Sequence, residues 1–186
     1  AYKGHNAIRW LKVADGSVAD EAAVPEPQAV AIDPHGRRVL VASKDRIVAL
    51  TRARKAPLDS ARDRPAAVVT GLTSPYRLDV EDATGEIYVY ESGESQQVKR
   101  FSPDGKLLKT LGAPGGRKDG PYDPMSFRTV HDLTADQRGG FFICEGWAAP
   151  RRTARFTKDG KLLNDWYGGQ MYANHGVPDP NDPTVV

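Results

Sequence analysis

Cysteine is almost absent from this sequence. Cys144 is its only cysteine, which excludes an intrachain disulfide and any metal cluster built from cysteines. It lies in the apolar segment "GGFFICEGW", where we expect the free thiol to serve as a small buried hydrophobe. The sequence also lacks any run of about 18 apolar residues, so we expect no membrane-spanning helix.

An excess of charge of one sign is lacking as well. The chain has 26 Lys and Arg against 24 Asp and Glu, a net charge of +2. Such a balance produces no global field that would favour nucleic acid or an anionic membrane. No window keeps apolar residues at helical spacing for three turns, whereas 18 glycines and 14 prolines indicate many turns. These features favour short strands joined by turns.

What the sequence does contain is a repeat. "RFSPDGKLLKTLG" (100–112) returns 55 residues later as "RFTKDGKLLNDWYG" (155–168), with seven of the first nine positions identical. The shared Asp-Gly pair predicts a hairpin turn, because Asp bonds its own backbone and Gly tolerates positive φ. Around it, short apolar runs separated by turn residues predict four strands per unit. In the middle copy these strands are predicted at Tyr76–Val80, Ile87–Tyr90, Gln97–Phe101 and Lys106–Leu111.

Four strands repeating every 45–55 residues or so are typical of a β-propeller. We therefore expect an all-β propeller of about four blades in a single domain, with three whole blades and two half-blades. The units are a half-blade at 5–18, blades at about 27–70, 72–112 and 127–168, and a half-blade at 172–186. The two half-blades could pair to close a four-bladed ring. We favour the alternative, in which the chain is a portion of a larger, six-bladed ring.

The segment "PYRLDV…GEIYVYESGESQQVKRFSPDGKLLKTLG" resembles the NHL repeat, and the resemblance is strongest over residues 75–168. It implies four-stranded blades around an axis, and a scaffold for a ligand or another protein. One departure recurs, since Glu91 and Glu145 (and Ser43 in the weakest copy) stand where the family usually has Asp. We interpret this position as structural, because a longer carboxylate can still bond the adjacent turn.

Ligand-binding positions are expected just before each innermost strand, where loops line the channel and one face. These positions are Gln28, Tyr76, His131 and His175. The two histidines share a register, which resembles the peptidyl-amidoglycolate lyase branch of such propellers, where histidines hold zinc. That resemblance implies zinc at His131 and His175, although the chain provides at most these two of the three protein ligands that a catalytic zinc site needs. The simpler interpretation is that both histidines are hydrogen-bonding residues of the channel, with no cofactor.

Three further hypotheses are open. Calcium-dependent lactonase propellers need converging oxygen ligands, and here only Asp132 and Asn174 flank suitable positions. Single-stranded RNA binding on a basic face would use the scattered arginines, but acidic residues dilute them, so we expect no nucleic acid. Trp147 with Arg151 and Arg152 would suit a contact with another protein.

The Gly- and Pro-rich stretch "LGAPGGRKDGPYDPMSF" (111–127) lacks the features of a phosphate-binding P-loop and is interpreted as a long connection between blades. The leading functional hypothesis is a non-catalytic propeller that binds a small ligand, another protein, or the remainder of its own ring. The main alternative is a zinc-dependent enzyme. The usual location of NHL-like bacterial propellers and the lack of redox cysteines favour an extracellular or periplasmic location.

Overall fold

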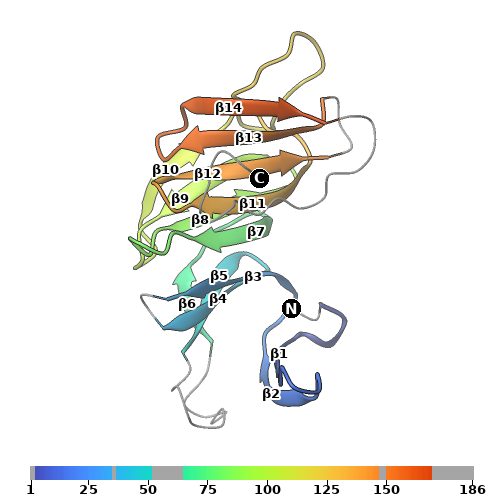
Figure 1. The fold of residues 1–186 in the computed structure, drawn as a ribbon, viewed down its shortest axis with the longest axis vertical. Helices are drawn as coiled ribbons and strands as arrows, with labels where there is room; N and C mark the ends of the chain where they lie inside the picture. Colours follow the sequence, from blue (N-terminus) through green and yellow to red (C-terminus); the bar gives the residue numbers. More distant parts are fainter. Residues whose placement is uncertain (1–2, 35–36, 52–64, 147–149, 169–186) are drawn as a thin grey trace.

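The computed structural model describes residues 3–34, 37–51, 65–146 and 150–168, which are almost entirely β-structure (Figure 1). One short 3-10 turn, η1 (Lys3–His5), precedes the first strand. The strands are β1 (Ala7–Leu11), β2 (Val18–Ala23), β3 (Pro27–Asp33), β4 (Arg38–Ser43), β5 (Arg46–Thr51), β6 (Ala66–Val69), β7 (Pro75–Val80), β8 (Ile87–Glu91), β9 (Gln97–Phe101), β10 (Leu107–Leu111), β11 (Val130–Asp136), β12 (Gly140–Glu145), β13 (Arg152–Thr157) and β14 (Leu162–Tyr167).

Within the described residues these strands form three four-stranded antiparallel sheets and one two-stranded sheet. The sheets are β3-β4-β5-β6, β7-β8-β9-β10, β11-β12-β13-β14 and β1-β2. Neighbours in each sheet are consecutive in the chain, so every sheet is a simple meander. This is the blade arrangement of a β-propeller of about four blades. The half-blade expected at 172–186 lies outside the described residues.

The first strand of each whole blade is innermost. β7 lies against both β3 and β11, and Figure 1 shows these strands side by side. Hydrogen bonds connect β7 to β11: the Asp79 carboxylate accepts from the Thr134 hydroxyl at 2.9 Å and from the Ala135 N–H at 2.7 Å. Arg77 Nε donates to the carbonyl of His131 at 2.5 Å. The outermost strands β10 and β14 share no comparable contact in this part of the chain, so the sheets fan outward from an axis.

Successive blades pack face to face. Because side chains alternate between the two faces of a strand, each second strand contributes side chains to the cores on both sides of its blade. In β8, Val89 belongs to the apolar cluster that contains Leu40 and Ile47 of the preceding blade. Its neighbour Tyr88 points the opposite way and meets Phe141 of the following blade, with ring centroids 5.6 Å apart. Because both faces are covered, all five residues of β8 are buried. The blade formed by β7–β10 therefore packs against a neighbour on each side.

The repeated Asp-Gly turn is a contact point between blades. Gly105 and Gly160 have φ of +89° and +88°, which favours glycine, and each turn abuts the outermost strand of the preceding blade. A Cβ on Gly105 would lie 1.9 Å from the Val68 carbonyl oxygen, and one on Gly160 would lie 2.5 Å from Leu111 Cδ2. The turn thus needs glycine for its backbone conformation and for the close approach, which explains why the repeat retains it.

We predict that Gly105→Ala lowers the free energy of unfolding by about 2–4 kcal/mol, combining left-handed strain with overpacking against Val68. Gly16→Ala is the matched control. Gly16 occupies the equivalent Asp-Gly turn with φ of +71°, but nothing lies within 4 Å of its Cβ position. It should lose only the strain contribution, about 1–2 kcal/mol. Urea denaturation of both variants checks this, and equal losses would contradict a close contact between blades.

Candidate binding face

One face of the molecule carries the longest described loops. It consists of the connections that lead into the innermost strands β7 and β11 (residues 70–74 and 112–129) together with the turns after β4 and β8 (44–45 and 92–96). We call it the loop face. Loops held on a rigid scaffold are where propellers and other β-folds place binding residues.

Three cavities lined by described residues lie at the loop face. The Tyr122 cavity, of about 540 Å³, is lined by Arg117, Lys118, Asp119, Gly120, Tyr122, Arg128, Pro150 and Tyr167. The Gln96 cavity, of about 320 Å³, shares Arg117, Lys118, Asp119 and Arg128 with it and adds Gly93, Gln96, Gly115 and Thr129. The Tyr76 cavity, of about 530 Å³, is lined by Glu26, Gln28, Lys44, Asp45, Thr73, Ser74, Pro75 and Tyr76.

The structure brings together two of the positions singled out before the innermost strands. Gln28 at the start of β3 and Tyr76 at the start of β7 both line the Tyr76 cavity. His131, at the corresponding place in β11, is half-buried, and its ring lies so close to Gly146 that a Cβ there would be 2.6 Å from Nε2. His175 and Trp147 lie outside the described residues, so the proposed zinc pair and the Trp contact stay predictions.

Arg152 is not an exposed contact residue, contrary to the sequence hypothesis. Its side chain is 0% exposed. It is the first residue of β13, directly opposite Glu145 in β12, and the pleat points it to the same side as the buried Ala154 and Phe156. Arg151, its neighbour, is half-buried.

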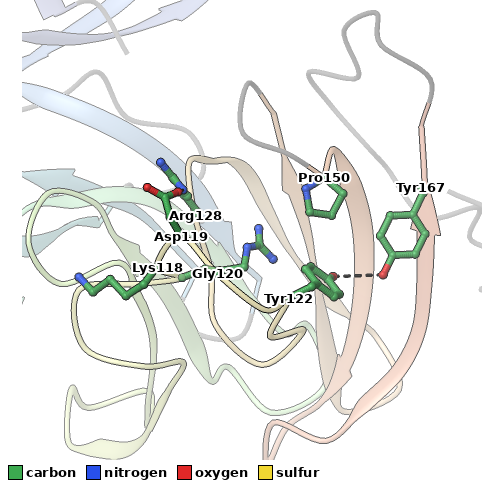
Figure 2. A pocket seen from close by; sticks show the side chains of 8 residues that line it. Lys118, Asp119, Gly120, Tyr122, Arg128, Pro150 and Tyr167 are labelled. Atoms are coloured by element: carbon green, nitrogen blue, oxygen red, sulfur yellow. Dashed lines mark hydrogen bonds and ion pairs between the residues drawn. The ribbon is translucent and has the colours of Figure 1, made fainter.

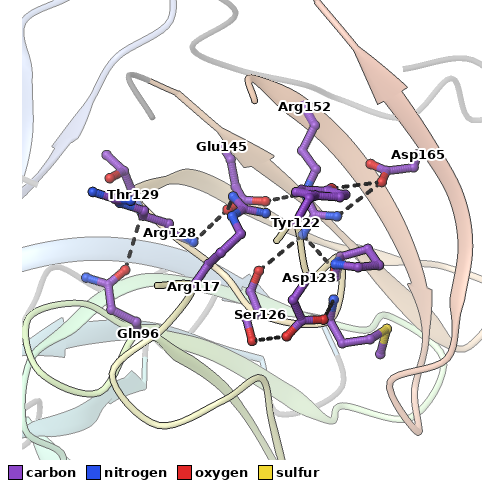
Figure 3. A network of polar contacts seen from close by, with 12 residues as sticks. Gln96, Arg117, Tyr122, Asp123, Ser126, Arg128, Thr129, Glu145, Arg152 and Asp165 are labelled. Atoms are coloured by element: carbon purple, nitrogen blue, oxygen red, sulfur yellow. Dashed lines mark hydrogen bonds and ion pairs between the residues drawn. The ribbon is translucent and has the colours of Figure 1, made fainter. Parts of the chain in front are cut away.

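Glu145 is the centre of a buried ion network that holds the 112–129 loop on the last blade (Figure 3). Its Oε1 accepts hydrogen bonds from Arg117 Nη2 and from the backbone N–H of Arg128, both at 2.6 Å. Its Oε2 accepts from Arg152 Nε. Arg152 further donates to Asp165 Oδ2 at 3.2 Å and to the carbonyl of Pro124 at 2.8 Å. Charge-assisted bonds of this kind fix side-chain geometry strongly.

The same position has a similar role in the preceding blade. Glu91, also fully buried, accepts from the backbone N–H of Thr73 at 2.6 Å and pairs with Lys99 at 2.5 Å. In the first whole blade Ser43 donates instead to the carbonyl of Pro25. Each second strand thus ends in a polar residue that bonds the loop before the innermost strand, and the structural interpretation of the glutamates is confirmed.

The Tyr122 cavity has two chemically different sides. Figure 2 shows Lys118, Asp119 and Arg128 on one side, Pro150 and Tyr167 on the other, and Tyr122 between them. The Tyr122 and Tyr167 rings meet edge to face with centroids 6.2 Å apart, and the Tyr167 hydroxyl donates to Tyr122 at 3.2 Å.

Two ionisable groups of the cavity have shifted pKa values. Partial burial raises the pKa of Tyr122, and the neighbouring Asp165 carboxylate, which accepts a hydrogen bond from the Tyr122 hydroxyl at 3.1 Å, acts in the same direction. The hydrogen bond from Arg128 to Asp119, 2.6 Å long, lowers the pKa of the Asp119 carboxyl. At neutral pH the cavity therefore presents a protonated phenol and an ionised carboxylate.

Arg117 connects the ion network to the cavity. Its side chain is 4% exposed, and its guanidinium carbon lies 5.0 Å from the centroid of the Tyr122 ring. Nη2 is bonded to Glu145, but Nε and Nη1 have no hydrogen-bond partner among the described residues. Buried donors without partners are uncommon in folded proteins.

Among the described residues, no group of three or more His, Cys, Asp or Glu side chains is arranged to hold a metal ion. No helix there has the length and apolar character needed to cross a membrane.

The fold and its loop face define the class of this protein, a β-propeller, and solved structures share that fold. One chain of a nidogen/laminin complex matches with a TM-score of 0.57 at 13% identity, over 87% of this chain and 56% of its own. A functionally unknown protein from Desulfotomaculum acetoxidans matches with a TM-score of 0.58 at 15% identity, over 89% and 50%. A Bacteroides uniformis protein named "putative 6-phosphogluconolactonase" matches with a TM-score of 0.63 at 16% identity, over 94% and 55%.

No family model and no curated protein matches the sequence, so the NHL resemblance stays a prediction. The chain spans about half the length of the solved chains that it matches. At such low identity these likenesses show the fold alone.

Proposed function

We propose that this chain is a non-catalytic binding propeller that holds a ligand at its loop face. The observation that carries the proposal is the gathering of three cavities at that face, the Tyr122 cavity being supported by the buried Glu145 network. A cavity of about 540 Å³ falls within the size range of small-molecule sites, roughly 300–1,000 Å³.

The protonation states around the Tyr122 cavity favour binding over proton transfer. A general acid or base works best when its pKa lies near the working pH. Here Arg128 holds Asp119 in its ionised form, and the raised pKa of Tyr122 keeps its hydroxyl protonated. Both groups are thus suited to hydrogen bonding and charge pairing with a bound molecule.

The zinc-dependent enzyme is the alternative, based on His131 and the undescribed His175. It predicts that the purified protein contains about one zinc per chain and that His131→Ala removes it. We expect instead that ligand binding at the loop face is the same with and without a chelator. Metal analysis by mass spectrometry, with and without EDTA, separates the two hypotheses.

The proposal is tested by screening the isotopically labelled protein against neutral and charged small fragments. Amide shifts caused by fragments that bind should concentrate in residues 73–76 and 112–129. The turns at 102–106 and 157–161 lie at the opposite ends of the strands and should stay unchanged. Shifts centred on those turns, or fragments that bind nowhere on the loop face, would refute the proposal.

A further inference from the structure

We infer that the Tyr122 cavity takes an organic anion. Its carboxylate or phosphate group would meet Lys118 and Arg128, and its planar apolar body would lie against Tyr122 and Tyr167. This inference rests on the proposed binding function and specifies the chemistry of the ligand.

The two sides of the cavity point to a ligand with two parts. Lys118 and Arg128 provide solvent-exposed cations on one side, Pro150 and Tyr167 form an apolar and aromatic wall on the other, and Tyr122 lies between them (Figure 2). Guanidinium and ammonium groups bind carboxylate and phosphate through charge-assisted hydrogen bonds. Aromatic rings favour the flat face of an apolar group. A simple inorganic anion would use only one of these sides.

The charges at the cavity leave room for an anion. Three cationic residues line it, Arg117, Lys118 and Arg128, against the single carboxylate of Asp119. Among the described residues, Lys118 has one hydrogen-bond acceptor, the Gly115 carbonyl at 3.1 Å. Arg117 and Arg152 are paired with Glu145 and Asp165, so the uncompensated positive charge at the cavity belongs to Lys118 and Arg128 rather than to Arg117.

Asp119 occupies the place of the ligand's acidic group. Its side chain is 93% exposed, and its only described partner of opposite charge is Arg128, at 2.6 Å. An incoming anion must therefore compete with this carboxylate for the Arg128 guanidinium. Removing the Asp119 charge should strengthen binding, whereas removing the Arg128 charge should weaken it. The two substitutions disrupt the same ion pair but should change the affinity for the anion in opposite directions.

Isothermal titration calorimetry with defined probes tests the inference. Phenyl phosphate and benzoate carry an anionic group on a ring, inorganic phosphate lacks the ring, and phenol lacks the anionic charge. We expect phenyl phosphate to bind at least about tenfold more tightly than either phosphate or phenol, since both sides of the cavity then contribute. Benzoate compared with phenyl phosphate distinguishes a carboxylate site from a phosphate site.

The affinity of three variants for phenyl phosphate provides a second test. Arg128→Gln should weaken phenyl phosphate binding about tenfold, and it leaves intact the Arg128 backbone N–H that bonds Glu145. Asp119→Asn should strengthen binding about threefold. Lys158→Gln, which removes an exposed cation from the turn after β13 on the opposite face, is the matched control and should change nothing.

Each outcome is decisive. Phenyl phosphate that binds no better than phosphate or phenol would overturn the inference, as would Asp119→Asn that weakens binding or Lys158→Gln that matches Arg128→Gln. If anionic probes fail while neutral fragments still shift amides of the loop face, the inference is wrong and the binding function stands. If no probe or fragment reaches that face, both are wrong.

Discussion

Glu145→Gln is expected to lower the free energy of unfolding by about 3–5 kcal/mol, as for other buried ion pairs that lose one partner. Glu145 is fully buried between Arg117 and Arg152, and both arginine side chains are also buried. Glutamine keeps the size of the side chain but removes the charge that compensates them. Chemical denaturation followed by circular dichroism measures the loss.

The control for Glu145 is Glu21→Gln. Glu21 forms an ion pair with Arg9 in which both side chains are substantially exposed. Exposed pairs of this kind contribute about 0–1 kcal/mol. A Glu145→Gln variant that is no less stable than Glu21→Gln would show that the network does not hold the 112–129 loop. Amide shifts at Arg117 and Arg128 in the variant should confirm where the loop loosens.

Phe156→Ala is the second large effect, with an expected loss of about 3–5 kcal/mol from the cavity it creates. Phe156 is fully buried between two blades. Its ring stacks on Phe141 with centroids 5.2 Å apart and meets Phe127 edge to face at 5.5 Å. Phe127 belongs to the 112–129 loop, so the same substitution should also loosen the Tyr122 cavity.

Leu163→Ala in the same blade is the control for Phe156. Leu163 lies in the outermost strand and is 46% exposed, so its truncation should change stability by only about 0.5 kcal/mol. Thermal and urea unfolding of both variants would separate the cases. Similar losses in the two variants would contradict the packing of β13 against the preceding blade.

The strands were predictable because their signals are local. The alternation of apolar residues and the Asp-Gly turn depend on neighbours in the chain, and the middle blade has strands at Pro75–Val80, Ile87–Glu91, Gln97–Phe101 and Leu107–Leu111. Each differs by no more than one residue at either end from the segment predicted. Cys144 was likewise predictable from its apolar segment, and it is buried at 4% exposure.

The candidate site was much less predictable, because it depends on contacts between distant residues. The 112–129 loop has no periodicity, and the bond from Arg117 to Glu145 spans 28 positions. Interpreting the loop as a plain connection between blades missed its role in the Tyr122 cavity. One signal was present for Arg152, since Arg152, Ala154 and Phe156 alternate in β13 and so share the buried face. That alternation predicts an inward arginine and therefore a buried acidic partner.

The radial arrangement of the blades is the claim on which the loop face and its cavities depend. Nuclear Overhauser contacts between blades test it most directly. We expect contacts from the Ala135 amide to the Asp79 side chain, between innermost strands, and from the Tyr88 ring to Phe141. We expect fewer contacts between the outermost strands β10 and β14. Equally dense contacts at the inner and outer strands would mean that the sheets stack in a line, and would contradict the propeller.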